Sequence, residues 1–275
     1  MESGRRVSRL VYNNEHYALQ RSFGVKELND LLEKAMERGP EFKTKQSFAP
    51  SGLGYSGSCP RYWYYAFNGV EFTYDTAATA MANMNAGSDA GVRLANVLEK
   101  AGILVEAEQE VNTIESDEFP PIRGYIDAVV NWKDEEVLVE IKTCKSSTWN
   151  QRATSNSVPT YQLAQLLVYM YVTGHDKGFF MTENKDTHEL FILPVKMTDE
   201  NKQLVEDIFE WMRTVKKNAD EGELPKRPFN KSSMNCKGCP VREVCWDGWT
   251  RGSVNGTDPN PGVVDLPVLE LPSGR

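Results

Sequence analysis

Three charged residues stand inside apolar runs of strand length near the middle of the chain. Asp127 interrupts the run 124–132, and Glu140 and Lys142 interrupt the run 137–143. Ionised side chains in such surroundings cost free energy unless a partner compensates the charge. Two carboxylates beside an ammonium group are suited to bind a divalent cation and to place a lysine next to the water that the cation activates. This is the chemistry of a metal-dependent phosphodiesterase.

The two runs and the short charged segment 133–136 between them predict a β-hairpin. Side chains alternate along a strand, so Glu140 and Lys142 share one face, and the hairpin brings Asp127 within reach of them. A surface ion pair is the alternative, because a Glu-x-Lys pattern is weak by itself. The apolar neighbours of the three charges favour the catalytic interpretation.

Periodicity predicts the elements that must position these residues. On the helix expected at 160–173, which Gly174 ends, Gln165 and Tyr169 are four residues apart and share a face. A polar loop is expected at 146–159, and Glu106, Glu108 and Glu110 are expected to form a solvated strand face. The other predicted helices and strands suit an α/β sandwich around a mixed sheet; they are helices 25–38, 87–101 and 199–217 and strands 104–111, 178–181 and 189–195.

Length and charge limit the classes of function. The 275 residues can bury a sizeable core, and no apolar run approaches the roughly 20 residues needed to cross a bilayer. We therefore expect a cytoplasmic protein. A net charge of −8 argues against a general nucleic-acid binder. Between 141 and 182, however, one acid, Asp176, stands against the four basic residues Lys142, Lys145, Arg152 and Lys177.

Four of the five cysteines have the arrangement of metal ligands. Cys236, Cys239 and Cys245 form a compact group, and Cys59 would supply a fourth thiolate from far upstream. Zinc and a [4Fe–4S] cluster fit four thiolates equally well on spacing alone. Cys144 is interpreted as a small buried residue. The aromatic run 62–67 that follows Cys59 is interpreted as the start of a buried helix in preference to an exposed base-stacking platform.

Taken together, Asp127, the segment 140–142, Gln165-x3-Tyr169 and the divided cysteine set resemble the RecB-like branch of the PD-(D/E)xK nuclease superfamily. Within it they are similar to the iron–sulfur exonucleases allied to the CRISPR-associated adaptation nucleases and to the nuclease domain of AddB. The similarity runs from about Ser51 to Cys245. It implies a restriction-endonuclease-like core, a mixed central sheet flanked by helices, with helical additions and an iron–sulfur-stapled C-terminal region.

The resemblance also implies roles. Asp127, Glu140 and the Ile141 carbonyl would hold Mg²⁺ or Mn²⁺, and Lys142 would orient or deprotonate the attacking water. Gln165 and Tyr169 would position the substrate strand. A structural [4Fe–4S] cluster, with zinc as the alternative, would be bound by the four cysteines Cys59, Cys236, Cys239 and Cys245.

One feature departs from the pattern of these relatives. They carry a metal-binding histidine on the helix before the first strand, whereas the helix expected here begins at Gly87 and has none. Either a residue such as Asp89 replaces it or the metal has one protein ligand fewer. The three histidines of the chain lie elsewhere, as His16, His175 and His188.

We therefore predict a metal-dependent DNA exonuclease that acts on single-stranded or frayed ends in recombination, repair or DNA processing. A catalytically weakened DNA-binding subunit and an endonuclease of the same superfamily are the alternatives. The expected organisation is an N-terminal extension (1–50), a nuclease domain (51–249) and an extended or disordered tail (250–275). The sequence is also compatible with a homo-oligomer and with a recombination or replication protein that binds the tail.

Overall fold

The computed structural model describes residue 21, residues 23–247 and residues 262–272. Two compact units are distinguished along the chain. One lies within residues 1–41 and 74–86 and contains helix α3 (Val25–Met36), none of whose residues is buried. The other comprises residues 42–73 and 87–275. The second unit contains the central sheet and the predicted catalytic residues.

The larger sheet has five strands in the order β3-β4-β5-β6-β7. Only β5 and β6 run parallel among its neighbouring pairs, and the other pairs are antiparallel. The predicted mixed α/β fold is therefore confirmed in outline. The strands are β3 (Leu104–Asn112), β4 (Arg123–Trp132), β5 (Glu135–Cys144), β6 (Lys177–Asn184) and β7 (Leu190–Lys196).

The predicted hairpin is formed by β4 and β5, with Ala128 paired to Val139. Lys133 and Asp134 make its turn with positive φ angles of 56° and 66°. Two consecutive residues of this conformation characterise the two-residue turn whose twist matches that of the flanking strands. The turn sets the register that brings Asp127 beside the Glu140 segment.

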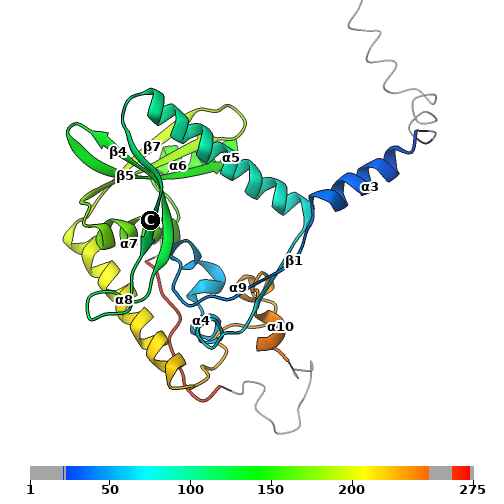
Figure 1. Cartoon of the computed structure of the whole chain (residues 1–275), viewed down its shortest axis with the longest axis vertical. Helices are drawn as coiled ribbons and strands as arrows, with labels where there is room; N and C mark the ends of the chain where they lie inside the picture. The colour runs from blue at the N-terminus through cyan, green and yellow to red at the C-terminus, as the bar shows by residue number, and fades with distance from the viewer. Residues whose placement is uncertain (1–20, 22, 248–261, 273–275) are drawn as a thin grey trace, which may run out of the picture. The chain divides into compact units, whose positions relative to one another are not determined.

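Helices cover both faces of this sheet (Figure 1). On one face Leu94 and Leu98 of α5 (Ala78–Lys100) pack in a buried cluster with Val139 and Ile141 of β5. Because strand residues alternate, Glu140 points to the opposite face, where α7 (Thr160–Thr173) lies. Helix α8 (Asp199–Asp220) packs against α7 on that side.

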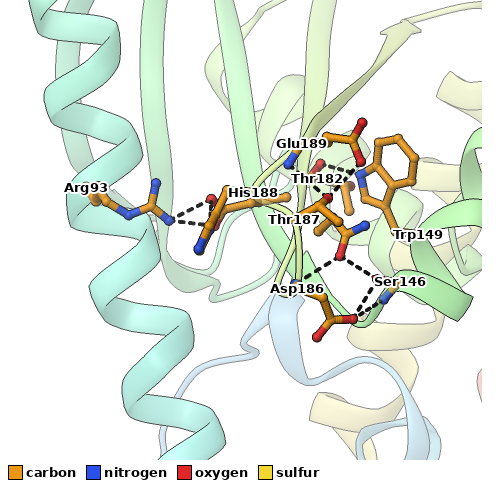
Figure 2. Close-up of polar contacts among 10 residues, drawn as sticks. Arg93, Ser146, Trp149, Thr182, Asp186, Thr187, His188 and Glu189 are labelled. Carbon is orange, nitrogen blue, oxygen red and sulfur yellow. Dashed lines mark hydrogen bonds and ion pairs between the residues drawn. The ribbon is translucent and has the colours of Figure 1, made fainter. Parts of the chain in front are cut away.

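Residues 146–159 do not form the polar loop expected from the sequence. Helix α6 (Ser146–Ser155) occupies most of this segment. Its first residue contacts the β6–β7 turn (Figure 2). The Ser146 N–H and hydroxyl donate to Asp186 Oδ2 over 3.0 and 2.6 Å. The hydroxyl oxygen also lies 3.0 Å from Asn184 Oδ1, within hydrogen-bond distance. A contact with residues 40 positions away starts this helix, so the local sequence did not predict it.

The same turn is tied to α5. The Glu183 carboxylate is buried and accepts from Arg93 Nη2 over 2.7 and 2.6 Å. His188 Nδ1 lies 3.0 Å from the same carboxylate, and Figure 2 shows His188 beside Arg93 of α5. These contacts fix β6, the parallel neighbour of the strand that carries Glu140 and Lys142.

The remaining described elements are not strands of the five-stranded sheet. The aromatic run is a buried helix, α4, as predicted, with Trp63 fully buried. A two-stranded sheet of β1 and β2 was missed, because Gly39 and Pro40 suggested only the end of a helix. The bounds are β1 (Arg38–Lys43), β2 (Phe72–Thr76), α4 (Pro60–Phe67), α9 (Met234–Lys237), α10 (Arg242–Cys245) and the short helices η1 (Pro50–Gly52) and η2 (Tyr55–Ser58).

Part of the predicted tail, residues 250–261 and 273–275, lies outside the described residues. Residues 262–272 pack on their own domain: the Leu269 N–H donates to the Ser58 carbonyl over 2.9 Å, and Trp211 Nε1 donates to the Pro267 carbonyl over 2.9 Å. Partner binding by the tail stays a prediction. Among the described residues, no helix has the length and apolar character needed to cross a bilayer.

Candidate active site

The β4–β5 hairpin joins Asp127 to the strand that carries the other two charges. The Ile141 N–H donates to Asp127 Oδ2 over 2.6 Å. On the same face as Glu140, Lys142 Nζ forms an ion pair with Glu140 Oε1. The three residues singled out in the sequence therefore lie together, and Ile141 contacts the first of them through its backbone.

Glu140 is the most buried member of this group, with 1% of its surface exposed. Its Oε1 accepts from Lys142 and, over 2.7 Å, from Gln165 Nε2 on α7. Its Oε2 is buried and has no hydrogen-bond partner among the described residues. Burial and the neighbouring charge of Asp127 raise the pKa of Glu140 to about 7, against the opposing effects of Lys142 and Gln165.

Burial also raises the pKa of Asp127, while Lys142 and the Ile141 N–H oppose the shift. The charge of Glu108, on the neighbouring strand β3, adds to the increase. The solvated face predicted for Glu106, Glu108 and Glu110 is confirmed, since all three are exposed, but the effect of Glu108 on Asp127 was not foreseen. Its position beside Asp127 depends on strand pairing and has no local signal.

Tyr169 lies one turn of α7 beyond Gln165 and is 1% exposed. Its pKa is raised well above the usual range, chiefly by burial and by the charge of Glu140, although the Tyr125 N–H and Gln165 donate to its hydroxyl. Its ring packs against Gly124, where an added Cβ would lie 2.2 Å from the Tyr169 hydroxyl oxygen. Gly124 was missed as part of the site; a glycine inside a strand is the signal for such a close approach.

The four cysteines predicted to act as ligands, Cys59, Cys236, Cys239 and Cys245, line one small cavity of about 20 Å³. Burial and the neighbouring thiols raise the pKa of Cys59 to about 12 and that of Cys239 to about 11. Backbone N–H groups of Arg61 and Tyr62 donate to the Cys59 sulfur and oppose its shift. Cys144, half-buried at the end of β5, does not line this cavity.

The cysteine-bearing segments are joined by contacts that need no metal. Ser56 donates to the Asn235 carbonyl over 2.7 Å, and Asn235 Nδ2 donates to the Tyr55 carbonyl over 2.8 Å. These bonds connect η2 to α9 across 179 or more positions of the sequence. Cys59 follows η2 directly, so the same bonds hold it near the C-terminal cysteines.

The two described histidines contact carboxylates other than Asp127 and Glu140. His175 lies 3.7 Å from Glu136, and His188 contacts Glu183. His16 lies outside the described residues. Asp89, named from the sequence as a replacement ligand, is exposed on α5.

A model of the PD-(D/E)XK nuclease superfamily matches residues 89–246, more than half of the chain. The chain belongs to this superfamily. The matched range of this PD-(D/E)XK nuclease contains the hairpin, α7 and three of the four cysteines; Cys59 lies before it.

Solved structures with sequence identities of 13–18% are also similar to this chain. SSO0001 is 18% identical over 84% of this chain and 98% of its own, with a TM-score of 0.44. An alkaline exonuclease, LHK-Exo from Laribacter hongkongensis, is 13% identical over 64% of this chain and 90% of its own, with a TM-score of 0.44. The structure of LHK-Exo in complex with dAMP is 15% identical over 52% of this chain and 72% of its own, with a TM-score of 0.43. No curated protein sequence matches the chain.

PD-(D/E)XK nucleases generally use divalent metals such as Mg²⁺ or Mn²⁺. The hairpin fits such a cation, because carboxylate oxygens are its preferred ligands and Glu140 Oε2 lies buried with no hydrogen-bond partner from the residues that the structure describes. Within residues 21, 23–247 and 262–272, no three His, Cys, Asp or Glu side chains are grouped as a complete metal site. This holds for the carboxylates and for the four cysteines alike.

Proposed function

We propose that this PD-(D/E)XK nuclease is a Mg²⁺- or Mn²⁺-dependent DNA exonuclease that acts on single-stranded or frayed ends in recombination, repair or DNA processing. The observation that carries the proposal is the set of contacts made by the two oxygens of the Glu140 carboxylate. One oxygen accepts from Lys142 and Gln165, and the other is buried without a hydrogen-bond partner in the described part of the chain. A buried carboxylate oxygen without a partner is costly, and a cation held together with Asp127 removes that cost.

Each residue of the hairpin then has a role. Asp127, Glu140 and the Ile141 carbonyl would hold the cation, which supplies Lewis-acid activation of water and neutralises phosphate charge. Lys142, with 25% of its side chain exposed, reaches the substrate side, where it orients the attacking water and stabilises the charge of the pentavalent phosphate. The water oxygen bonds to phosphorus as the bond to the leaving oxygen breaks, and the leaving oxygen takes up a proton.

Gln165 and Tyr169 act as positioning residues in this proposal. Both are buried, and Gln165 donates to Glu140 and to the Tyr169 hydroxyl. Because both side chains are buried, we propose that they act on the substrate strand indirectly, by orienting the Glu140 carboxylate. We expect Gln165→Ala to leave that carboxylate less well oriented and to lower kcat more than it raises KM.

The nuclease assay uses end-labelled single- and double-stranded DNA with Mn²⁺, and with chelator as the blank. We expect wild type and a Lys133→Ala control, changed at the hairpin turn, to release nucleotides, and Lys142→Ala to lose at least about 100-fold in rate. Equal rates of nucleotide release for Lys142→Ala and wild type would contradict the proposal. Loss of closed circular DNA would instead show an endonuclease, and binding without products a non-catalytic subunit.

We further propose that the chain belongs to the RecB-like branch and that its cysteines hold a [4Fe–4S] cluster with a structural role. The support is the donor set: the thiols Cys59, Cys236, Cys239 and Cys245 line one cavity, and N–H groups donate to two of the sulfurs. Anaerobically purified wild type would be brown and contain iron and sulfide, and Cys239→Ser would lose both. Colourless protein with stoichiometric zinc would overturn the cluster, while a Cys144→Ser control should retain it.

A further inference from the structure

Glu108 of β3 lies between two residues that pair with the neighbours of Asp127 on β4. The strand pairs on either side of it, which establish this register, are Ala107 with Ala128 and Gln109 with Ile126. This register brings the Glu108 segment alongside Asp127, and the charge of Glu108 acts on Asp127. The pairing therefore brings a third acidic side chain to the edge of the hairpin site.

The charges of this group are poorly balanced. The charge of Asp127 contributes to the raised pKa of Glu140, and the charge of Glu108 contributes to the raised pKa of Asp127. Lys142 is the ammonium group that opposes the pKa increases of both Asp127 and Glu140. Like charges at short range are unfavourable unless a cation compensates them. A divalent cation supplies the positive charge that one lysine cannot.

The backbone at Glu108 is also unusual. Its φ angle is +53°, within the nine-residue strand β3. Residues with a Cβ are disfavoured in this left-handed region, which glycine, asparagine and aspartate adopt more easily. Strained conformations of this kind persist where the surrounding structure requires a particular side-chain direction, and they cluster at functional sites.

We propose that Glu108 supplies a third carboxylate to the divalent cation held by Asp127 and Glu140. The proposal rests on the metal-dependent activity proposed above and names one more ligand of the same site. Glu108 is exposed, so rotation about its side-chain bonds brings its carboxylate to a cation beside Asp127 without moving the strand. The buried, unpartnered Oε2 of Glu140 points independently to a cation at this position.

The test is calorimetric titration of Mn²⁺ into the metal-free full-length protein. We expect Glu108→Gln to weaken Mn²⁺ binding by at least about 10-fold, the size of effect seen even for residues that only support a metal ligand. Glu106→Gln is the matched control, because Glu106 is an exposed glutamate on the same strand, opposite Val129. It should bind Mn²⁺ as wild type does. The cleavage rate of Glu108→Gln at limiting Mn²⁺ should fall and recover as Mn²⁺ is raised.

A second variant separates lost binding from misfolding. Glu108→Gly removes the carboxylate and also accepts the positive φ, so the metal-free variant should melt at a higher temperature than wild type while still binding Mn²⁺ weakly. If wild type binds Mn²⁺ and cleaves DNA but both Glu108 variants bind as tightly as Glu106→Gln, the inference is overturned and the proposed function stands. Wild type that neither binds Mn²⁺ nor cleaves would overturn both.

Discussion

Replacing Gly124 by alanine places a methyl group against Tyr169. The added Cβ would lie 2.2 Å from the hydroxyl oxygen and 3.0 Å from the ring carbon that bears it. Tyr169 is 1% exposed, and its hydroxyl accepts from the Tyr125 N–H, so the ring has little room to withdraw. Overpacking of this kind costs about 1–3 kcal/mol. The reduced chain entropy of the unfolded state returns about 0.4–1 kcal/mol, which leaves a net loss of about 1–2 kcal/mol in the free energy of unfolding.

The comparison variant is Gly91→Ala on α5, where an added Cβ meets nothing within 4 Å. This change should stabilise the protein by about 0.5–1 kcal/mol, because alanine favours the helix. Urea unfolding of both variants and wild type measures the difference, and the nuclease assay follows the site. Displacement of Tyr169 also disturbs Gln165 and Glu140, so activity should fall only in Gly124→Ala.

A double variant identifies the clashing atom. Tyr169→Phe removes the hydroxyl, so the cost of Gly124→Ala should be smaller when it is introduced into Tyr169→Phe than into wild type. Two results would refute the reasoning: stabilisation of Gly124→Ala equal to that of Gly91→Ala, or an equal cost of Gly124→Ala in both backgrounds.

Two further predictions concern the β6–β7 turn. Arg93→Ala leaves the buried Glu183 carboxylate in contact with His188 but without its guanidinium partner, and should lower the free energy of unfolding by about 1–3 kcal/mol, measured in urea. Adding Glu183→Gln should recover part of the loss. The Ser146 hydroxyl and N–H lower the pKa of Asp186, so its stabilising effect is present above the unfolded-state pKa and is lost as pH falls through the folded-state pKa. Melting temperatures measured against pH should therefore fall less steeply in acid for Asp186→Asn than for wild type.

Much of the fold could be predicted because its signals are local. The β4–β5 hairpin has apolar runs on both sides of a charged turn, and the periodicity of α7 predicted its bounds as 160–173. The charges Asp127, Glu140 and Lys142 were found because they interrupt apolar strands. Helix α6 was missed because its polar residues show no amphipathic pattern and its start depends on Asp186, 40 positions away.

By itself, then, the sequence identified the residues that we propose carry the chemistry and the strands and helix that hold them. Local periodicity and the cost of buried charge are sufficient for that. Only the tertiary structure decided that the Glu108 segment lies alongside Asp127, that Tyr169 packs on Gly124, and that Glu140 has one oxygen without a partner among the described residues. The register of paired strands and the packing of α7 on the sheet join residues far apart in the chain, and such contacts leave no pattern among neighbouring residues.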